Sequence, residues 1–189
     1  MIITTDRLTL REFVADDWEA MLAYQSQPEY LRYYPWNGRT EEQVRAFLNR
    51  FLVWQSEEPR RKYQLAVTLA DTCELIGCCG IRKELAESSE AELGYEIAPA
   101  HWGQGYATEA ARAMLTFAFD TLRLHRVWST CVAENVASAR VLAKLGMRLE
   151  GRLREKQCMK GRWWDTLVYA ILEREWRGAS TWLRTRSCA

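Results

Sequence analysis

The sequence has few of the residues that build metal sites in proteins. It contains only two histidines, His101 and His125, and its six cysteines form no C-x-x-C pair. Zinc sites take their ligands from closely spaced cysteines and histidines, so a zinc site has little support here. We expect no metal, and we interpret the cysteines as small buried thiols in a reducing cytoplasm.

Long hydrophobic runs and an excess of one charge are also missing. No stretch approaches the roughly 18 apolar residues that can span a membrane. The N-terminus, MIITTDRLTLREF, lacks the basic and apolar parts of a secretory signal. The formal net charge is +1, without the concentrated basic face of nucleic-acid-binding proteins. We therefore expect a cytoplasmic protein with no membrane or nucleic-acid partner, and we expect the basic cluster at residues 60–62 to be solvated surface.

Hydrophobic and aromatic residues are plentiful by contrast. They include nine tryptophans and eight tyrosines, and hydrophobic residues make up 48% of the chain. Such a chain can bury a core, and its 189 residues fit one domain. We place this domain at residues 1–176 and interpret residues 177–189 as a C-terminal tail.

Strand-like and helix-like segments alternate along the chain. Apolar alternation predicts strands at residues 7–13, 63–69, 74–81, 92–98, 126–132, 147–154 and 164–172. The short ADTC connector predicts a hairpin between the second and third of these. Apolar stripes predict helices after a cap at Asp16 or Asp17, after a capping box of Thr40 and Gln43, from Thr108 to about residue 122, and from Asn135 to Leu145. Gly146 is placed to end the last helix in a left-handed conformation.

The stretch HWGQGYATEA, residues 101–110, places two glycines directly before a helix. The first amides of a helix lack helical partners and carry partial positive charge. The missing side chains at Gly103 and Gly105 let a phosphate approach those amides. Thr108 can cap the helix or add a hydroxyl donor. The alternative is a glycine-assisted turn without a ligand.

The residues after this turn limit the kind of phosphate ligand. A P-loop is excluded because no Lys-Ser or Lys-Thr pair follows. The segment GQGYAT partly matches the dinucleotide fingerprint GxGxxG, but its third small residue, Ala107, comes one position early. No acidic residue ends a second strand about 20 residues later, so dinucleotide binding is disfavoured.

A second segment, CVAENVASARVLAKLGM (residues 131–147), adds the decisive pattern. Together with PAHWGQGYATEA it resembles the GNAT superfamily of acyl-CoA-dependent N-acetyltransferases, and more closely the branch of ribosomal-protein N-terminal acetyltransferases (Rim-type). The first segment is similar to the pyrophosphate loop of that family, R/Q-x-x-G-x-G/A, with Trp102 in place of the usual leading Arg or Gln. The second matches the N-x-x-S…K-L-G-F motif through Asn135, Ser138, Lys144, Leu145, Gly146 and Met147. The opening TDRLTLREF and the late EGRLREK…GRWWDTLVYAIL also resemble this branch.

The resemblance implies an α/β (α+β) fold and a cosubstrate. The fold is a mixed, mostly antiparallel central sheet flanked by helices, in which the strands at 92–98 and 126–132 splay apart to form the CoA cleft. The cosubstrate is acetyl-CoA. By this resemblance, the pyrophosphate is held by the amides of Gln104, Gly105, Tyr106, Ala107 and Thr108. The pantetheine arm pairs with the backbone of Ile97 and Ala98 and forms a hydrogen bond with Asn135.

The implied reaction is transfer of the acetyl group to a primary amine by direct attack in a ternary complex. At pH 7 only about one lysine side chain in 2,500 is neutral, against about one α-amine in six to eleven. The chemistry therefore favours a protein N-terminal α-amine, although a small-molecule amine stays open. A catalytically idle acyl-CoA-binding sensor or interaction module is the alternative function, and a homodimer is a possible assembly.

Two residues are candidates for moving protons in this reaction. Glu96, on the strand that enters the turn, is the first candidate for the general base, with Glu92 and Glu155 in reserve. The alternative for Glu96 is a solvated strand glutamate. Many relatives use a helix tyrosine as the acid, and that position is Leu142 here. Ser138 is then the candidate donor to the thiolate, or else only a helix cap beside Asn135.

The acceptor site is expected among aromatic residues. Tyr33, Tyr34 and Trp36 follow the first helix, in a region that often covers the acceptor in this family. Trp163 and Trp164 form a second aromatic cluster. The alternative for all five is ordinary packing of core and edges.

Overall fold

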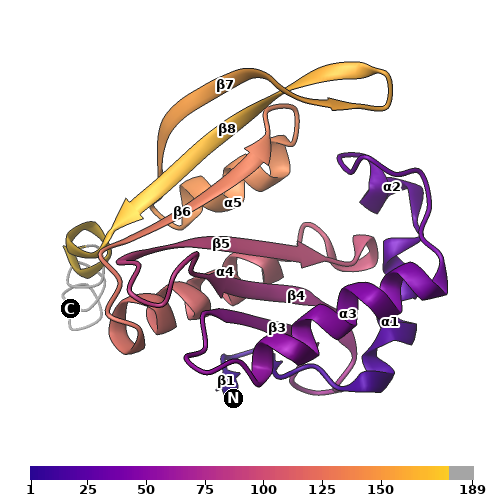
Figure 1. Cartoon of the computed structure of the whole chain (residues 1–189), viewed down its shortest axis with the longest axis horizontal. Helices are drawn as coiled ribbons and strands as arrows, with labels where there is room; N and C mark the ends of the chain where they lie inside the picture. Colours follow the sequence, from indigo (N-terminus) through magenta and orange to yellow (C-terminus); the bar gives the residue numbers. More distant parts are fainter. Residues whose placement is uncertain (179–189) are drawn as a thin grey trace.

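An eight-stranded mixed sheet forms the centre of the protein (Figure 1). We describe residues 1–178 of a computed structural model. The strands are β1 (Ile2–Thr4), β2 (Leu8–Arg11), β3 (Lys62–Leu69), β4 (Leu75–Arg82), β5 (Glu90–Ile97), β6 (Arg126–Val132), β7 (Arg148–Met159) and β8 (Arg162–Leu172). Their order across the sheet is β1-β2-β3-β4-β5-β6-β8-β7. Neighbours are antiparallel except β5 and β6, which are parallel. The expected mixed, mostly antiparallel sheet is confirmed.

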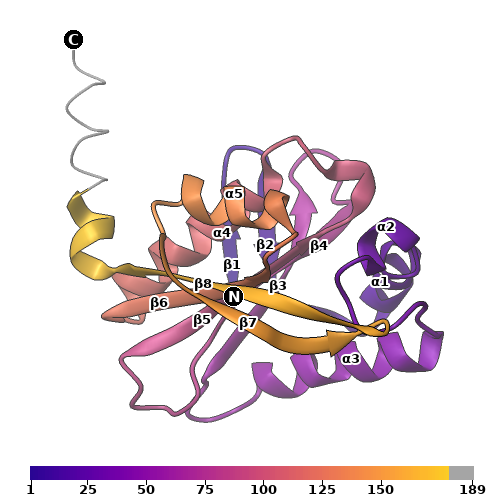
Figure 2. The ribbon, with the colours of Figure 1, turned by 90° about the horizontal axis from the view of Figure 1, so that it is seen from above.

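Helices cover both faces of this sheet (Figure 2). They are α1 (Trp18–Gln25), α2 (Pro28–Leu31), α3 (Glu41–Gln55), α4 (Tyr106–Thr116) and α5 (Val136–Lys144). A π-helical turn, Phe117–Thr121, extends α4. Helices α4 and α5 lie on one face, whereas α1, α2 and α3 lie on the other. In the part of the chain described, no helix is long and apolar enough to cross a membrane.

The central strands are apolar on both sides because both of their faces are covered. On β3, Leu65 and Val67 join the core beneath α4, while Ala66 between them joins the core beneath α1 and α3. The core continues to the end of the described chain, where Trp176 is buried and stacks on Phe119. Most of the tail predicted at 177–189 lies outside the described residues.

The start of α3 is capped as the sequence predicts, but the start of α1 is not. Thr40 Oγ1 accepts the Gln43 amide at 3.3 Å, and the Gln43 side chain accepts the Thr40 amide at 3.1 Å. The predicted capping by Asp16 or Asp17 is wrong. A 3-10 turn precedes α1, and Asp17 itself has helical backbone angles. Its carboxylate turns back to the Val14 amide (2.8 Å) and to Arg11 (2.7 Å).

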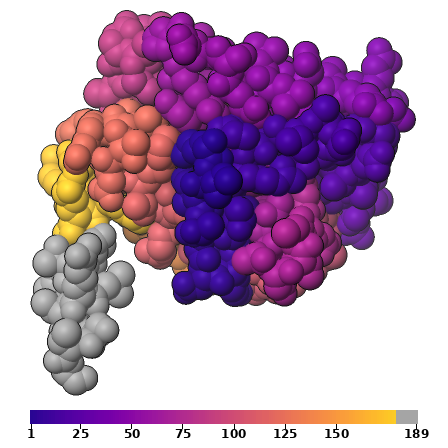
Figure 3. Space-filling model, turned by 90° about the horizontal axis from the view of Figure 1, so that it is seen from below, coloured from indigo at the N-terminus to yellow at the C-terminus, as the bar shows by residue number. Residues whose placement is uncertain are grey.

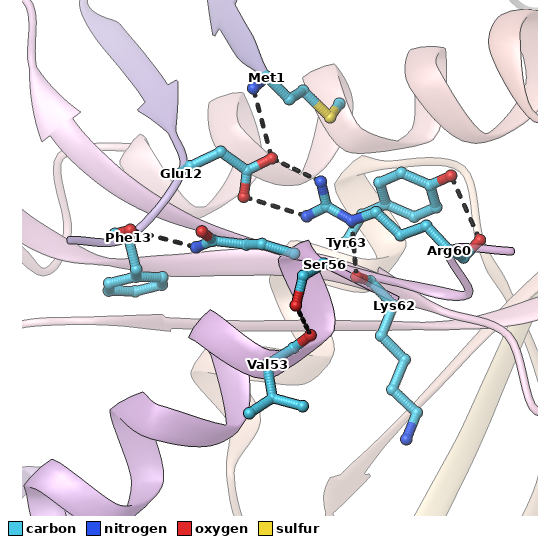
Figure 4. Close-up of polar contacts among 9 residues, drawn as sticks. Met1, Glu12, Phe13, Val53, Ser56, Arg60, Lys62 and Tyr63 are labelled. Carbon is cyan, nitrogen blue, oxygen red and sulfur yellow. Dashed lines mark hydrogen bonds and ion pairs between the residues drawn. The ribbon is translucent and has the colours of Figure 1, made fainter. Parts of the chain in front are cut away.

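Arg60 anchors the N-terminal segment instead of lying in solvent. It donates to both carboxylate oxygens of Glu12, at 2.7 and 3.0 Å, and Glu12 also pairs with the N-terminal amine of Met1 (Figure 4). The expectation of a solvated basic cluster is therefore wrong for Arg60, because its planar fork fits a carboxylate. The segment so anchored crosses one surface of the molecule in indigo (Figure 3).

The cysteines are only partly as expected. Cys78, Cys79 and Cys131 are buried, but Cys73 and Cys158 are exposed, and all five are free thiols. The sixth, Cys188, lies outside the described residues. The expectation of buried thiols is wrong for Cys73, which lies at a turn, and for Cys158, which lies near the end of a hairpin. No helix in the described part of the chain covers either place.

The capping box of α3 predicts a measurable stability effect. Thr40→Ala removes the acceptor for the Gln43 amide, so we expect the free energy of unfolding to fall by about 1 kcal/mol. Thr40→Ser keeps the acceptor and serves as the matched control. Urea denaturation of the three proteins measures the difference, and equal midpoints for Ala and Ser would contradict the assigned cap.

Candidate active site

Strands β5 and β6 pair over only three positions and then part. The ladder joins residues 90–92 to residues 126–128. Beyond it, β5 continues to Ile97 and stays paired with β4, and β6 continues to Val132 and stays paired with β8. The two halves of the sheet therefore diverge at the carboxyl ends of these strands. We call this divergence the splay.

The glycine turn leads from the end of β5 into α4. Gly103 and Gly105 have left-handed backbone angles, with φ of +76° and +87°, and α4 begins at Tyr106. A Cβ on Gly103 would meet nothing within 4 Å, so the backbone angle and not crowding calls for glycine there. The predicted cap at Thr108 is wrong, since Gly105 is the residue before the helix and Thr108 lies within the first turn.

Arg7, in the N-terminal segment, binds this turn and stabilises it. Sequence patterns do not reveal this role. Its Nη1 donates to the carbonyl of Gln104 at 3.1 Å, and its guanidinium lies over the Tyr106 ring. The same side chain pairs with Glu109 of α4 at 2.6 Å, and Thr5 Oγ1 donates to Glu109 at 2.7 Å. The β1–β2 turn therefore clamps the start of α4.

Trp102 fixes the end of β5. Its Nε1 donates to the carbonyl of Ile97 at 2.6 Å. The amide of Ala98 donates to Ile76 and its carbonyl accepts from His101. Both backbone groups of Ala98 thus form hydrogen bonds within the chain. Pairing of Ile97 and Ala98 with a pantetheine arm stays a prediction, and it requires the arm to replace some of these hydrogen bonds.

Ser138 and Asn135 meet at the start of α5. Asn135 Oδ1 accepts the amide of Ser138 at 3.1 Å, so Asn135 caps the helix. The Ser138 hydroxyl lies 2.9 Å from the phenol oxygen of Tyr95, which comes from β5 across the splay. Leu142, at the position where relatives carry the acid tyrosine, is fully buried. The predicted left-handed Gly146 that ends α5 is confirmed, with φ of +82°.

Glu96 lies on the opposite face of β5, inside a cage of donors. Its Oε1 accepts from Tyr24 at 2.6 Å and from Gln25 at 2.8 Å. Its Oε2 accepts from Tyr30 at 2.5 Å and from Tyr34 at 3.4 Å. Four donors fill the lone-pair positions of a carboxylate. This excludes the alternative in which Glu96 is a solvated strand glutamate.

The tyrosines of this cage keep their protons at neutral pH. Burial raises the pKa of Tyr24, Tyr30 and Tyr34 above the ordinary value, and the negative charge of Glu96 raises it further. They therefore act as donors to a single carboxylate. No sequence pattern predicts this arrangement, because all three tyrosines lie more than 60 residues before Glu96, at separations of 72, 66 and 62.

The residues predicted to bind the acceptor substrate lie in two different places. Tyr34 stacks between Tyr30 (4.8 Å) and Trp36 (5.3 Å), beside Glu96. Tyr33 points the other way and donates to the carbonyl of Glu134 at 2.9 Å. Their role in binding an acceptor stays a prediction.

The reserve residues lie apart from this cage. Glu92 pairs with Arg82 at 3.2 Å, and Glu155 is exposed on β7. Of the second aromatic cluster, Trp164 is buried and contacts Tyr33 edge-on, while Trp163 is exposed.

The sequence matches the family model described as the acetyltransferase (GNAT) domain over residues 7–148. The protein is a GNAT N-acetyltransferase. It is 41% identical to the uncharacterized N-acetyltransferase YnaD of Bacillus subtilis, over 93% of this chain and 99% of that protein. It is 26% identical to the [ribosomal protein uS5]-alanine N-acetyltransferase of Escherichia coli, over 92% of each chain.

A solved structure supports the same assignment. The crystal structure of a GNAT-family acetyltransferase from Bacillus anthracis superposes with a TM-score of 0.81 at 35% identity, covering 92% of this chain and 99% of that one. The resemblance to GNAT acetyltransferases, including Rim-type relatives, is confirmed. GNAT proteins use acetyl-CoA. The match to the family and to N-acetyltransferases confirms the prediction that the protein is an enzyme.

The left-handed conformation of Gly105, in the turn before α4, leads to a prediction about acetyl-CoA binding. Gly105→Ala forces an L-residue into a left-handed conformation, at a cost of about 1–2 kcal/mol, and displaces the amides at the start of α4. We expect acetyl-CoA affinity to fall about tenfold or more. Gly161→Ala, at φ of +75° in the distant β7–β8 turn, is the matched control. Calorimetric titration measures both, and equal affinities would contradict a special role for Gly105.

The contacts of Glu109 with Thr5 and Arg7 lead to a prediction about how folding stability depends on pH. Burial raises the pKa of Glu109, but hydrogen bonds from Thr5 and Arg7 outweigh it, and the net shift is downward. A lowered pKa stabilises the fold above the ordinary value near 4.3 and loses that stability as the pH falls through the folded pKa. We expect Glu109→Gln to be less stable at pH 7, with a difference that shrinks below about pH 4.

Urea midpoints over this pH range measure the effect. Glu41→Gln, which breaks an exposed ion pair with Arg45 on α3, is the control and should change stability little. A Glu109→Gln deficit that stays constant down to acid pH would show that the charge of Glu109 is not what stabilises the clamp.

Proposed function

We propose that this acetyltransferase transfers the acetyl group of acetyl-CoA to the α-amine of a protein or peptide N-terminus. The amine attacks the thioester directly in a ternary complex held at the splay. One observation carries the proposal. Beyond the last β5–β6 pair, Glu96 and the Ser138 hydroxyl lie on opposite faces of β5, so an acceptor from one face and a thioester from the other meet where the sheet opens.

The cosubstrate end of this complex follows from the turn before α4. In the proposal, the amides from Gln104 to Thr108 bind the pyrophosphate of acetyl-CoA, helped by the helix dipole. Arg7 keeps these amides in place through Gln104 and Glu109. In the proposal, the pantetheine arm then runs past the end of β5 to Asn135, which accepts the amide of Ser138.

The acceptor end is the cage around Glu96. The longest of its four hydrogen bonds is that from Tyr34, at 3.4 Å, so this contact is the weakest of the set. We infer that the acceptor amine takes the place of Tyr34 at Oε2, and that Glu96 receives the amine proton there. Trp36, stacked on Tyr34 and 38% exposed, places this position next to solvent.

The acceptor class follows from the cost of removing the proton from the amine. An α-amine has a pKa near 7.7–8.0, well below that of a lysine side chain. Deprotonation of an unperturbed lysine costs over about 4 kcal/mol at pH 7, a cost that an α-amine largely avoids. The E. coli relative named for the alanine of a ribosomal protein supports the same acceptor class.

The proposal predicts which amines release CoA thiol from acetyl-CoA. Peptides with a free N-terminus should react, and the same peptides with a blocked N-terminus and a free lysine should react at most slowly. Glu96→Gln should lower kcat by about a hundredfold or more, with acetyl-CoA affinity nearly unchanged. Glu155→Gln, an exposed carboxylate on β7, is the matched control.

Two results would contradict this proposal. Faster reaction of the lysine peptides would overturn the α-amine assignment. Unchanged turnover in both Glu96→Gln and Ser138→Ala would overturn the proton-transfer roles while leaving the acetyltransferase activity itself intact.

A further inference from the structure

The departing CoA thiolate needs a donor, and this chain lacks the helix tyrosine that many relatives use. Leu142 occupies that position and is fully buried among the core side chains. A serine hydroxyl alone is a much weaker acid than a thiol, so a second group that assists Ser138 is needed. We propose that Tyr95 is a positioning residue that donates its hydroxyl hydrogen to Ser138 Oγ and directs the serine hydrogen toward the CoA sulfur. This inference rests on the proposed function.

The first support is the place from which Tyr95 reaches Ser138. Tyr95 lies on β5 three residues beyond Glu92, the last residue paired with β6. Its hydroxyl donates to the Ser138 carbonyl at 3.1 Å and also lies 2.9 Å from Ser138 Oγ, so its one hydrogen lies between the two oxygens of Ser138. The contact therefore crosses the splay at the depth where the proposed mechanism places the thioester.

The second support is the surroundings of the Ser138 hydroxyl. Ser138 also interacts with the thiol of Cys131 on β6 and lowers the pKa of that thiol, against the larger effect of burial. A Tyr95 hydrogen given to Ser138 Oγ leaves the serine hydrogen for a sulfur acceptor at the splay. A CoA thiolate at the splay is a charged sulfur, so it is the stronger acceptor of that hydrogen.

The surroundings keep Tyr95 a donor. Burial raises the pKa of the Tyr95 phenol well above its ordinary value. The thiols near it are neutral at pH 7, because burial also raises the pKa of Cys131 and takes that of Cys79 to about 12. Its other titratable neighbour is the phenol of Tyr169 on β8. The chain from Tyr95 through Ser138 to a sulfur is thus neutral until a thiolate forms.

The inference is tested on the complex of the protein with CoA, without any acceptor amine. A hydrogen bond to the thiolate lowers the pKa of the bound thiol, which the thiolate band in ultraviolet difference spectra reports. Tyr95→Phe keeps the ring in the core and removes the hydroxyl. We expect it to raise the pKa of bound CoA by about one unit, a tenfold change in ionisation. Tyr63→Phe, a tyrosine packed against the same core from β3, is the matched control and should change nothing.

A double-mutant cycle separates positioning from a structural role. Ser138→Ala keeps the carbonyl that Tyr95 also contacts, so a purely structural effect of Tyr95→Phe would survive in that background. We expect Ser138→Ala to raise the thiol pKa and Tyr95→Phe to add nothing to it. With a reactive peptide, Tyr95→Phe should lower kcat about tenfold and leave the KM for acetyl-CoA unchanged.

Each remaining outcome has a definite meaning. An unchanged thiol pKa in Tyr95→Phe, or an equal rise in the Ser138→Ala background, overturns the positioning role alone. The expected cycle in a protein that acetylates no N-terminal peptide supports the inference and overturns the proposed acceptor. A folded protein that does not bind CoA overturns both.

Discussion

The separation of β5 from β6 is the constraint on which the rest of the structure depends. Beyond their last common pair, each strand keeps its other neighbour, β4 for β5 and β8 for β6. The separation therefore leaves unpaired only the backbone groups that face the gap, and buried groups of this kind need partners. Trp102 supplies one by donating to Ile97, and Tyr95 and Ser138 bridge the two sides with hydroxyl groups. The remaining groups lie where an extended ligand can pair with them.

The turn before α4 depends on residues from the start of the chain. Two left-handed glycines shape it, but glycine also makes a turn more flexible in the absence of other contacts. Arg7 offsets that flexibility by binding the carbonyl of Gln104, the ring of Tyr106 and the carboxylate of Glu109. Arg60 and Glu12 anchor the far end of the same N-terminal segment. The turn before α4 is therefore held from the edge of the sheet, although about a hundred residues separate the two in sequence.

Local patterns in the sequence predict most elements of this fold. The capping box at Thr40, the hairpin of β3 and β4, and the left-handed Gly146 each follow from interactions within a few residues. The cage around Glu96 does not, because its tyrosines lie 62 to 72 residues away in the sequence and meet Glu96 only in the folded chain. The capping prediction for α1 is wrong for a different reason, since the Asp17 carboxylate binds the Val14 amide and the Arg11 side chain before the helix. The resemblance to GNAT proteins makes Glu96 and Ser138 candidates, but the side chains that contact them are visible only in three dimensions.

Consecutive residues of β5, beyond its last pair with β6, keep the acceptor of the amine proton apart from the donor to the thiolate. Side chains of a strand alternate between its faces, so Glu96 faces the α1–α2 side and Tyr95 faces α5. The proposed reaction takes a proton from the amine and leaves a thiolate that accepts a hydrogen bond. On the same face of β5 as Glu96, the Tyr95 phenol would lie on the side of the cage and could not reach Ser138. The strand between them keeps the acceptor for the amine proton and the donor chain for the sulfur apart, while the splay lets the two reacting atoms meet.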